Sequence, residues 1–395
     1  MDDERKAVSQ DWALKVFSSI HRIPAAAWDA CAGAGLADNN PFVRHAFFSA
    51  LEDSGSVDAA AGWQPQHIVL EDRDGCVLAC APLYLKSHSY GEYVFDWGWA
   101  EAYQRAGGRY YPKLQCAVPF TPVTGRRLMV RPDLGETEQR EAQATLLAGM
   151  IALARRLKVS SLHVTFPTEP ECDLMTKAGL LARIGEQYHW KNENYASFED
   201  FLGALSSRKR KAIRKERAGA QAAVRIQQIA GADITPEHWD AFWIFYQDTG
   251  ARKWGTPYLT RAFFDIIGDS MRDSIVLFLA YDQDRPIAGA LNFVGPDCLY
   301  GRYWGCTRDV PFLHFELCYY QAIDYAIAHS LARVEAGAQG EHKLARGYEA
   351  VPTYSAHYIA NEGFRSAVAD FLERETQAMV RQIEFLGDME PFKKG

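Results

Sequence analysis

Apolar and polar residues follow the same succession of patterns in the two halves of the chain. Short apolar runs broken by a polar turn predict antiparallel strands, with Asp74-Gly75 as the turn in the first half and 282–285 in the second. The third strand of each set is rich in aromatic residues and glycine. The predicted strands are 67–70, 77–85 and 93–99 in the first half, and 274–280, 286–294 and 299–305 in the second.

Helical periodicity predicts helices before and after each set of strands. In the second half, Tyr319, Ala322, Ile323 and Ala326 share one helix face, and Thr235-Pro236 is a typical helix start. A further strand is predicted after the last of these helices in each half. The predicted helices are 25–32, 42–53, 136–157, 314–329 and two that begin at Thr235 and Thr260, and the final strands are 161–166 and 333–338.

This repeated order predicts a mixed α/β fold built twice, with domains at 1–195 and 196–395. The first half carries an additional segment, 101–131, that has no counterpart in the second. The alternative to duplication is a chance recurrence of aromatic hairpins, which are common. We prefer duplication because the order of the elements is shared.

Charge is unevenly distributed along the chain. The 395 residues carry a formal net charge of −7, which argues against a protein that coats nucleic acid, and 48% hydrophobic residues exclude a disordered chain. Residues 208–217 nevertheless contain seven Lys or Arg and one Glu, a local charge of +6. This run predicts an exposed basic helix near 206–217 that binds phosphate groups of an RNA or of a nucleotide-activated substrate; a solvated surface without a partner is the alternative. The candidate residues are Arg208, Lys209, Arg210, Lys211 and Arg214.

Signals for export or membrane insertion are missing from the sequence. The first six residues are mostly charged, and no window approaches the roughly 18 apolar residues that a membrane span needs. The eight cysteines are scattered without a C-x-x-C pair, which is typical of reduced thiols. No His or Cys spacing indicates a metal site. We therefore predict a cytoplasmic protein with no integral membrane contact and no metal.

Polar residues gather around the end of the predicted strand 333–338. Loops at strand ends carry many functional residues, so we expect this loop to contribute to a site. Glu335 is a candidate general base for an amine nucleophile, and His342 is the second catalytic candidate. An ion pair of Glu335 with Arg302 or Arg333 is the alternative, because a carboxylate on an interior strand is costly without a partner. The binding candidates of this loop are Gln339, Glu341, Lys343 and Arg346.

Further binding candidates lie on neighbouring elements. Arg302, Tyr303 and Trp304 belong to the adjacent predicted strand, where an arginine between aromatic residues is harder to bury than they are. His314 and Glu316 lie in the first turn of a predicted helix, whose free N–H groups can receive an anion. The candidates of the first half, expected beside a cleft between the two halves, are Glu92, Asp96 and Trp97.

The order of elements resembles that of the GNAT acyltransferase fold, and two copies in one chain resemble the Fem-type aminoacyl transferases of peptidoglycan assembly. A closer resemblance is carried by segments 206–215, 301–306, 311–316 and 335–348, together with 89–97 and 119–127 in the first half. Through these segments the chain resembles the bacterial FemAB-like family over nearly its whole length. The resemblance implies two tandem GNAT-like domains, with the basic helix near the substrate channel of the second domain.

The resemblance also implies an activity, the transfer of an acyl or aminoacyl group to an amine, with a cell-wall precursor or another small molecule as acceptor. No tightly bound cofactor is implied; acyl-CoA or aminoacyl-tRNA is the co-substrate, and the basic helix is where a tRNA would bind. The usual coenzyme A pyrophosphate loop, Arg/Gln-x-x-Gly-x-Gly/Ala, is missing, because 307–313 contains no glycine and Pro311 lacks an N–H donor. This departure weakens acetyl-CoA as donor, and Fem-type enzymes likewise lack the loop because their donor is an aminoacyl-tRNA.

Two alternatives to this activity stay open. A protein that kept the fold without catalysis would recognise a cell-wall precursor or an RNA through the basic helix and an aromatic cleft. A conventional acetyl-CoA-dependent enzyme would act on a small amine. The sequence carries no Ser-His-Asp spacing, P-loop or Rossmann fingerprint that would favour another class of enzyme, and it does not indicate an oligomeric state.

Overall fold

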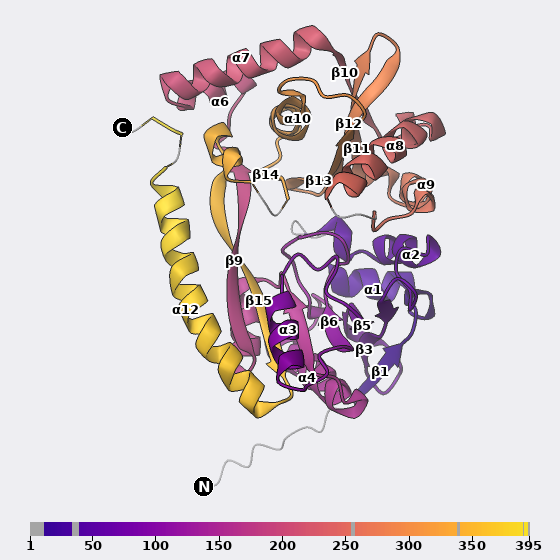
Figure 1. The fold of residues 1–395 in the computed structure, drawn as a ribbon. Coiled ribbons are helices and arrows are strands. Elements are labelled where there is room, and N and C mark those ends of the chain that lie inside the picture. The colour runs from indigo at the N-terminus through magenta and orange to yellow at the C-terminus, as the bar shows by residue number, and fades with distance from the viewer. Residues whose placement is uncertain (1–11, 34–38, 254–256, 338–339, 390, 394–395) are drawn as a thin grey trace.

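The computed structural model describes residues 12–33, 39–253, 257–337, 340–389 and 391–393, with the backbone alone for 249–253. Figure 1 shows two layered halves that are joined along one side by β9, β15 and helix α12. The elements of the first half are β1 (Ala13–Phe17), α1 (Ala25–Ala32), α2 (His45–Asp53), β2 (Trp63–Pro65), β3 (His67–Glu71), β4 (Val77–Ala81), β5 (Leu83–Lys86), α3 (Trp97–Arg105), β6 (Lys113–Cys116), β7 (Met129–Val130), α4 (Glu136–Leu157), β8 (Ser161–Thr165), α5 (Glu169–Lys177) and β9 (Leu181–Lys191).

The second half begins after β9 and ends with the longest helix of the molecule. Its elements are α6 (Phe198–Ala204), α7 (Ser207–Ala223), β10 (Arg225–Ala230), α8 (Pro236–Lys253), α9 (Arg261–Ser270), β11 (Ile275–Asp282), β12 (Arg285–Val294), β13 (Cys298–Cys306), α10 (Leu313–Phe315), α11 (Gln321–Ala328), β14 (Arg333–Glu335), β15 (Glu349–Ile359) and α12 (Glu362–Gly387). A π-helical turn, η5 (Glu316–Tyr320), separates α10 from α11, and the 3-10 turns are η1 (Ile20–Arg22), η2 (Pro41–Val43), η3 (Gly231–Asp233), η4 (Arg272–Ser274) and η6 (Glu341–Arg346).

An eleven-stranded sheet runs through both halves in the order β10-β11-β12-β13-β14-β9-β15-β8-β6-β5-β2, and a smaller sheet, β1-β3-β4-β7, lies in the first half. The two halves exchange strands within the large sheet. β9 of the first half pairs with β14, β15 of the second half pairs with β8, and β9 and β15 pair with each other. Each half therefore completes the sheet of the other. The predicted domain boundary near residue 195 lies in the loop between β9 and α6 and stays a prediction.

Among the described residues, each half contains one parallel strand pair. β6 pairs in parallel with β8, and β13 pairs in parallel with β14. A parallel pair needs a long crossover connection. This connection contains α4 in the first half and η5 with α11 in the second. The two halves thus share a common frame, and the strand ends of these two pairs correspond to each other.

The predicted strand at 93–99 is wrong. Helix α3 begins at Trp97, and the counterpart of β13 is β6, which lies inside the segment 101–131 that we expected to have none. Phe95, Trp97 and Trp99 alternate as in a strand, but Trp99 and Ala100 are buried on one helical face. A short aromatic run fits both periods, and tertiary packing decides between them.

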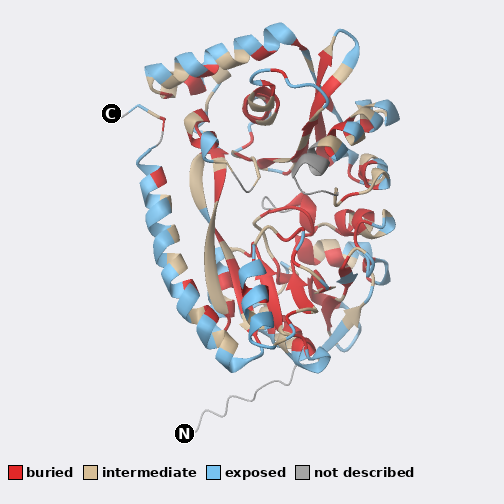
Figure 2. Cartoon of the chain, viewed as in Figure 1, coloured by how far each residue is buried: buried red, intermediate tan, exposed pale blue. Residues whose placement is uncertain are grey.

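Buried residues concentrate in the sheets and on the helix faces that cover them (Figure 2). One core spans both halves: the ring of Phe42 lies 4.7 Å from that of Phe293 and 5.3 Å from that of Tyr300, and Phe47 lies 5.9 Å from Phe263. Helix α7, by contrast, is mostly exposed, as its basic sequence predicts. Within the described residues, no helix has the combination of length and apolar character that crossing a membrane requires.

Candidate functional site

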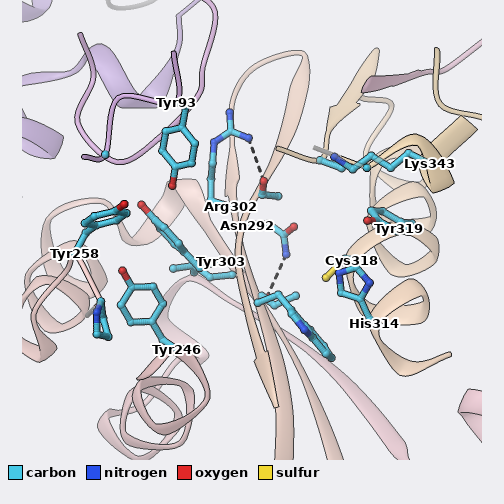
Figure 3. Close-up of a pocket in the computed structure, with 18 of the residues that line it drawn as sticks. Tyr93, Tyr246, Tyr258, Asn292, Arg302, Tyr303, His314, Cys318, Tyr319 and Lys343 are labelled. Atoms are coloured by element: carbon cyan, nitrogen blue, oxygen red, sulfur yellow. Dashed lines mark hydrogen bonds between the residues drawn. The ribbon is translucent and has the colours of Figure 1, made fainter. Parts of the chain in front are cut away.

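The large sheet opens where β13 and β14 separate. Their parallel pairing ends at Tyr300 and Glu335, after which β13 continues along β12 to Cys306 while the chain beyond β14 turns away at Gly337, whose φ is +79°. A cavity of about 700 Å³ lies in the opening. Residues from β12, β13, η5, η6 and the loop before α3 line it (Figure 3).

This cavity passes through the sheet from one face to the other. Consecutive strand residues point to opposite faces. Tyr303 belongs to the core that includes α8 and α9, and Trp304 packs against the core that includes α11. Figure 3 shows two groups of side chains, one on each side of the strands. Tyr93, Tyr246, Tyr258 and Tyr303 form one group, and Tyr319, His314 and Cys318 form the other. The cavity is therefore lined by side chains from both faces of the sheet.

A β-bulge shapes the strand at the centre of the cavity. Leu291 faces Tyr303 and Asn292 faces Gly301, so Arg302 is the extra residue that has no partner on β12. The Asn292 side chain is buried; its Nδ2 donates to the carbonyl of Ala290 at 3.3 Å, but its Oδ1 has no hydrogen-bond partner. A buried acceptor without a partner is uncommon. It is available to an N–H group of a ligand.

Glu335 lies behind this strand rather than on the cavity wall. Its Oε2 accepts a hydrogen bond from Arg302 Nη2 at 3.2 Å, and its Oε1 lies 3.5 Å from Arg333 Nε. Burial raises the pKa of Glu335, but the charges of His189, Arg302 and Arg333 outweigh burial and leave that pKa below its ordinary value. Glu335 is thus held as a carboxylate in the ion pair that was the alternative to a general base.

Two histidines and a tyrosine form the polar end of the cavity. His342 Nε2 lies 2.8 Å from the hydroxyl of Tyr319, and the His314 ring lies 5.4 Å from the Tyr319 ring and 6.1 Å from the His342 ring. Burial raises the pKa of Tyr319, so its hydroxyl stays protonated at neutral pH. Tyr319 and Cys318 belong to the π-helical turn η5; such turns are frequent at functional sites. This cluster contains the groups best placed to move a proton in the cavity.

Among the other candidates near η6, only some reach the cavity. Lys343 lines it and donates to the carbonyl of Gly337 at 2.9 Å. Glu341 is exposed and is not among the lining residues, and Gln339 lies outside the described residues. Arg346 points away, because it donates to Glu216 of α7 at 2.9 Å and to the carbonyl of His342 at 2.8 Å.

Glu316 is a buried anchor and does not line the cavity. Its Oε1 accepts hydrogen bonds from Gln321 at 2.7 Å, Gln221 at 2.9 Å and Arg217 at 3.3 Å. Gln221 and Arg217 belong to α7, so this carboxylate ties the basic helix to η5. A polar residue this deeply buried needs partners, and here they come from a neighbouring helix.

The basic residues of α7 lie behind the cavity wall and do not line it. Arg208, Lys211 and Arg214 are exposed, and Arg214 pairs with the exposed Glu199; Lys209 and Arg210 are half-buried. The helix packs against η5 and η6, which carry Tyr319 and His342. The basic surface of α7 is thus attached to elements that line the cavity, on their side away from it.

The loop before α3 forms the wall that the first half contributes. Alternate residues of the loop line the cavity, and Trp97, 41% exposed, lies at its rim. Glu92 and Asp96 face the other way, where Lys113 Nζ donates to them at 2.7 and 2.5 Å, so the expectation that they face a cleft is wrong. The lining residues of this loop are Ser89, Gly91, Tyr93 and Phe95, and Trp97 is the first residue of α3.

The charges behind that wall are buried together. Burial raises the pKa of Glu92 to about 7, and burial lowers the pKa of Lys86 to about 6. Lys86 Nζ lies 3.7 Å from Glu92 Oε1 and 3.5 Å from the centre of the Trp63 ring. Glu92 and Asp96 therefore hold the wall in place against the first half and are not in position to touch a substrate.

Sequence reasoning missed several lining residues that tertiary packing brings in. Tyr246 of α8 lies 5.4 Å from Tyr303, whose hydroxyl donates to the carbonyl of Phe120 at 3.0 Å. Burial raises the pKa of both tyrosines, which stay protonated. Only Tyr93 of this set lies in 89–97, one of the segments that carry the family resemblance. The missed lining residues discussed here are Tyr93, Tyr246, Tyr258, Asn292, Cys318 and Tyr319.

Comparison with a family profile shows the family of this chain, and comparison with solved structures shows its fold. The profile of the FemAB-like family, described as peptidoglycan biosynthesis/recognition, matches residues 19–394. The structure of FemX aligns with a TM-score of 0.55 at 13% identity, over 88% of this chain and 98% of FemX. The C-terminal domain of a putative lysylphosphatidylglycerol synthetase from Agrobacterium fabrum aligns with a TM-score of 0.51 at 11% identity, over 89% of this chain and 95% of that domain. No curated protein sequence matches significantly. The mixed α/β GNAT-like fold expected from the sequence is confirmed.

Proposed function

Because the chain belongs to the FemAB-like family of GNAT acyltransferases, we propose that the cavity between β13 and β14 is an active site for acyl transfer to an amine. The observation that carries this proposal is the opening itself, a cavity of about 700 Å³ that crosses the sheet. It gives an acyl donor and an amine acceptor separate approaches to one point. Holding two reactants in this way supplies much of the rate enhancement in transfer reactions.

In the proposed reaction, the amine nitrogen attacks the acyl carbonyl carbon, a C–N bond forms, and the C–O or C–S bond to the leaving group breaks. Asn292 Oδ1 accepts a hydrogen bond from the attacking amine, since it lacks a partner in the protein. N–H groups of β13 around the bulge at Arg302 stabilise the negative charge that develops on the carbonyl oxygen. His342, hydrogen-bonded to Tyr319, takes the proton from the amine and returns it to the leaving group.

For the donor, we propose an aminoacyl-tRNA ahead of acyl-CoA. The exposed basic residues of α7 supply phosphate contacts, and the helix packs on the turns that carry Tyr319 and His342. The segment after β13, where a coenzyme A loop would lie, has no glycine, and Pro311 has no N–H. For the acceptor, we propose the free amine of a cell-wall precursor, in keeping with the family.

A binding protein without catalysis is the second candidate, and one observation favours it. Glu335 ends the paired part of β14, where the opening begins, but its carboxylate is engaged in an ion pair. Only the histidines are then left to transfer a proton. Such a protein would hold the same two partners in the cavity without joining them.

The experiment that separates these candidates supplies both donors to the purified chain. Charged tRNA or acetyl-CoA is incubated with an amine-bearing cell-wall precursor, and the amide product is measured by mass spectrometry. We expect product with charged tRNA and its loss in Asn292→Ala, while a matched exposed variant, Asn194→Ala, keeps activity. Saturable binding of precursor and tRNA without product would favour the binding protein. Product with acetyl-CoA alone would establish the conventional acetyltransferase instead.

A further inference from the structure

A second, smaller cavity lies behind the wall of the first. Its volume is about 240 Å³, and Tyr93 and Phe95 line both cavities, so the loop before α3 separates them. The remaining walls come from β9, β15, α12 and Phe166, the residue after β8, at the side where the two halves are joined (Figure 1). No step of the proposed reaction uses this space. It holds on the order of eight water-sized groups, at roughly 30 Å³ each.

Aromatic rings and a bare strand surface form much of this second cavity. Tyr93, Phe95, Phe166 and Tyr354 line it from three different segments of the chain. Gly185 lies in the middle of β9, and a Cβ atom there would approach Thr353 Oγ1 to 3.0 Å. A glycine inside a strand often marks a place where a ligand approaches the backbone closely.

The charges of this cavity leave one carboxylate in excess. Arg183 is neutralised by Glu375, to which its Nε and Nη2 donate at 2.7 Å each, and its Nη1 donates to the carbonyl of Phe95 at 2.7 Å. Glu186 has no such cation among its hydrogen-bond partners in the described chain. Its Oε1 accepts from the hydroxyl of Tyr188 at 3.1 Å and from Gln382 at 3.0 Å, but its Oε2 is buried without any partner.

We infer that the second cavity binds a primary alkylammonium group. The ammonium donates to Glu186 Oε2, which satisfies an acceptor that is otherwise costly to bury. The faces of the surrounding aromatic rings attract a cation, and the alkyl chain fills the apolar remainder of the cavity. This inference does not rest on acyl transfer, because it concerns binding at a site separated from the first cavity by the loop before α3.

The test is a calorimetric titration of the full chain at pH 7 with n-pentylamine, and with 1-pentanol as the uncharged probe of the same length. We expect saturable binding of the amine, at least tenfold tighter than that of the alcohol. Glu186→Gln should weaken amine binding at least tenfold because it removes the charge and keeps the size. Glu373→Gln, the same change at an exposed position of α12, should leave it unchanged.

A second variant guards against misfolding of Glu186→Gln. Gly185→Ala narrows the cavity beside Thr353, and we expect it to lower amine affinity while the melting temperature stays near that of the parent chain. Equal binding of alcohol and amine, no binding of either, or unchanged affinity in Glu186→Gln would each overturn the inference. Loss of amine binding in Asn292→Ala but not in Glu186→Gln would also overturn it, since the amine would then occupy the first cavity.

Discussion

Beyond the parallel pair β13–β14 the sheet opens into a cavity, whereas beyond the parallel pair β6–β8 the protein's own side chains fill the corresponding place. Arg127 is the main filler. It is completely buried, and its guanidinium donates to the carbonyls of Thr165, at the end of β8, at 2.9 Å, of Val123 at 2.6 Å and of Gly125 at 3.0 Å. Its own carbonyl lies 4.0 Å from the thiol of Cys116, at the end of β6.

A buried carboxylate completes this filling. Glu171 accepts hydrogen bonds from the backbone N–H of Arg127 at 2.9 Å and of Leu128 at 2.7 Å. The second half has no equivalent plug among its described residues: the bulge at Arg302 and Gly301 leave the strand edge open. The same frame therefore serves two purposes. One copy is closed and supplies stability and a wall, and the other is open and, in the proposed function, holds the reactants.

The largest expected effect is on catalysis. It is tested by comparing one histidine of the second half, His342, with one histidine of the first half, His163. His342→Gln should lower kcat about 10²- to 10⁴-fold, because it removes the proposed proton carrier, and leave the free energy of unfolding nearly unchanged. His163→Gln should lower the free energy of unfolding and leave kcat nearly unchanged. His163 is buried in the first half and is hydrogen-bonded to Ser161 at 2.7 Å and to His357 at 2.7 Å. Steady-state kinetics and urea unfolding of both variants check this. Equal kcat in His342→Gln and the parent chain would remove His342 from the mechanism.

The next effect is on stability and tests the plug. Arg127→Met removes a buried guanidinium and leaves the carbonyls of Val123 and Thr165 without their donor, so we expect the free energy of unfolding to fall by about 3–5 kcal/mol. Arg105→Met, at an exposed position of α3, should change it by less than about 0.5 kcal/mol. Urea denaturation gives both values. If Arg127→Met were as stable as the control, the first-half opening would not be held closed by this residue.

The smallest effect is a pH dependence of the wall that the first half contributes. Burial lowers the pKa of Lys86 to about 6, below its ordinary value of 10.5, so the unfolded chain binds the proton between these values and the folded chain does not. Stability contributed by this group therefore rises with pH in that window, by at most about 1.4 kcal/mol per pH unit. Above pH 7 Glu92, whose pKa is about 7, is mostly ionised in both states.

Unfolding measured between about pH 7.5 and pH 9.5 tests this dependence. Lys86→Met should remove the rise with pH that the parent chain shows, and the exposed control Lys177→Met should keep it. A parent chain whose stability is flat over this range would mean that Lys86 stays charged behind the wall.

Local sequence patterns predicted the elements well where the apolar residues fit either the helical or the strand period but not both. Helix α4 has the bounds expected from its apolar stripe, and β11, β12 and β13 begin and end within a few residues of their predicted limits. The prediction for 93–99 was wrong because its aromatic residues fit both the strand period and the helical period. β9 and β15 were not predicted to pair across the halves, because nothing local in either strand specifies a partner so distant in sequence.

Some of the predicted site residues line the cavity, and others are buried in ion pairs or hydrogen bonds away from it. His314, His342, Lys343, Tyr303, Trp304 and Trp97 do line the cavity, because strand ends and helix starts beside an opened sheet face it. Glu92, Asp96, Glu316 and Arg346 are charged residues whose partners come from elsewhere in the fold, and no pattern in the sequence distinguishes a buried ion pair from a binding group. Asn292 and Tyr246 line the cavity because of tertiary packing, and no pattern in the sequence indicated them.

The most direct test of the open and closed halves is a crystal structure of the chain with an amide-linked aminoacyl-adenosine, a stable mimic of the end of a charged tRNA. We predict its acyl carbonyl between β13 and β14, beside the bulge at Arg302 and within reach of His342. A ligand bound between β6 and β8 in place of Arg127, or bound only on the surface of α7, would contradict the assignment of chemistry to the second half.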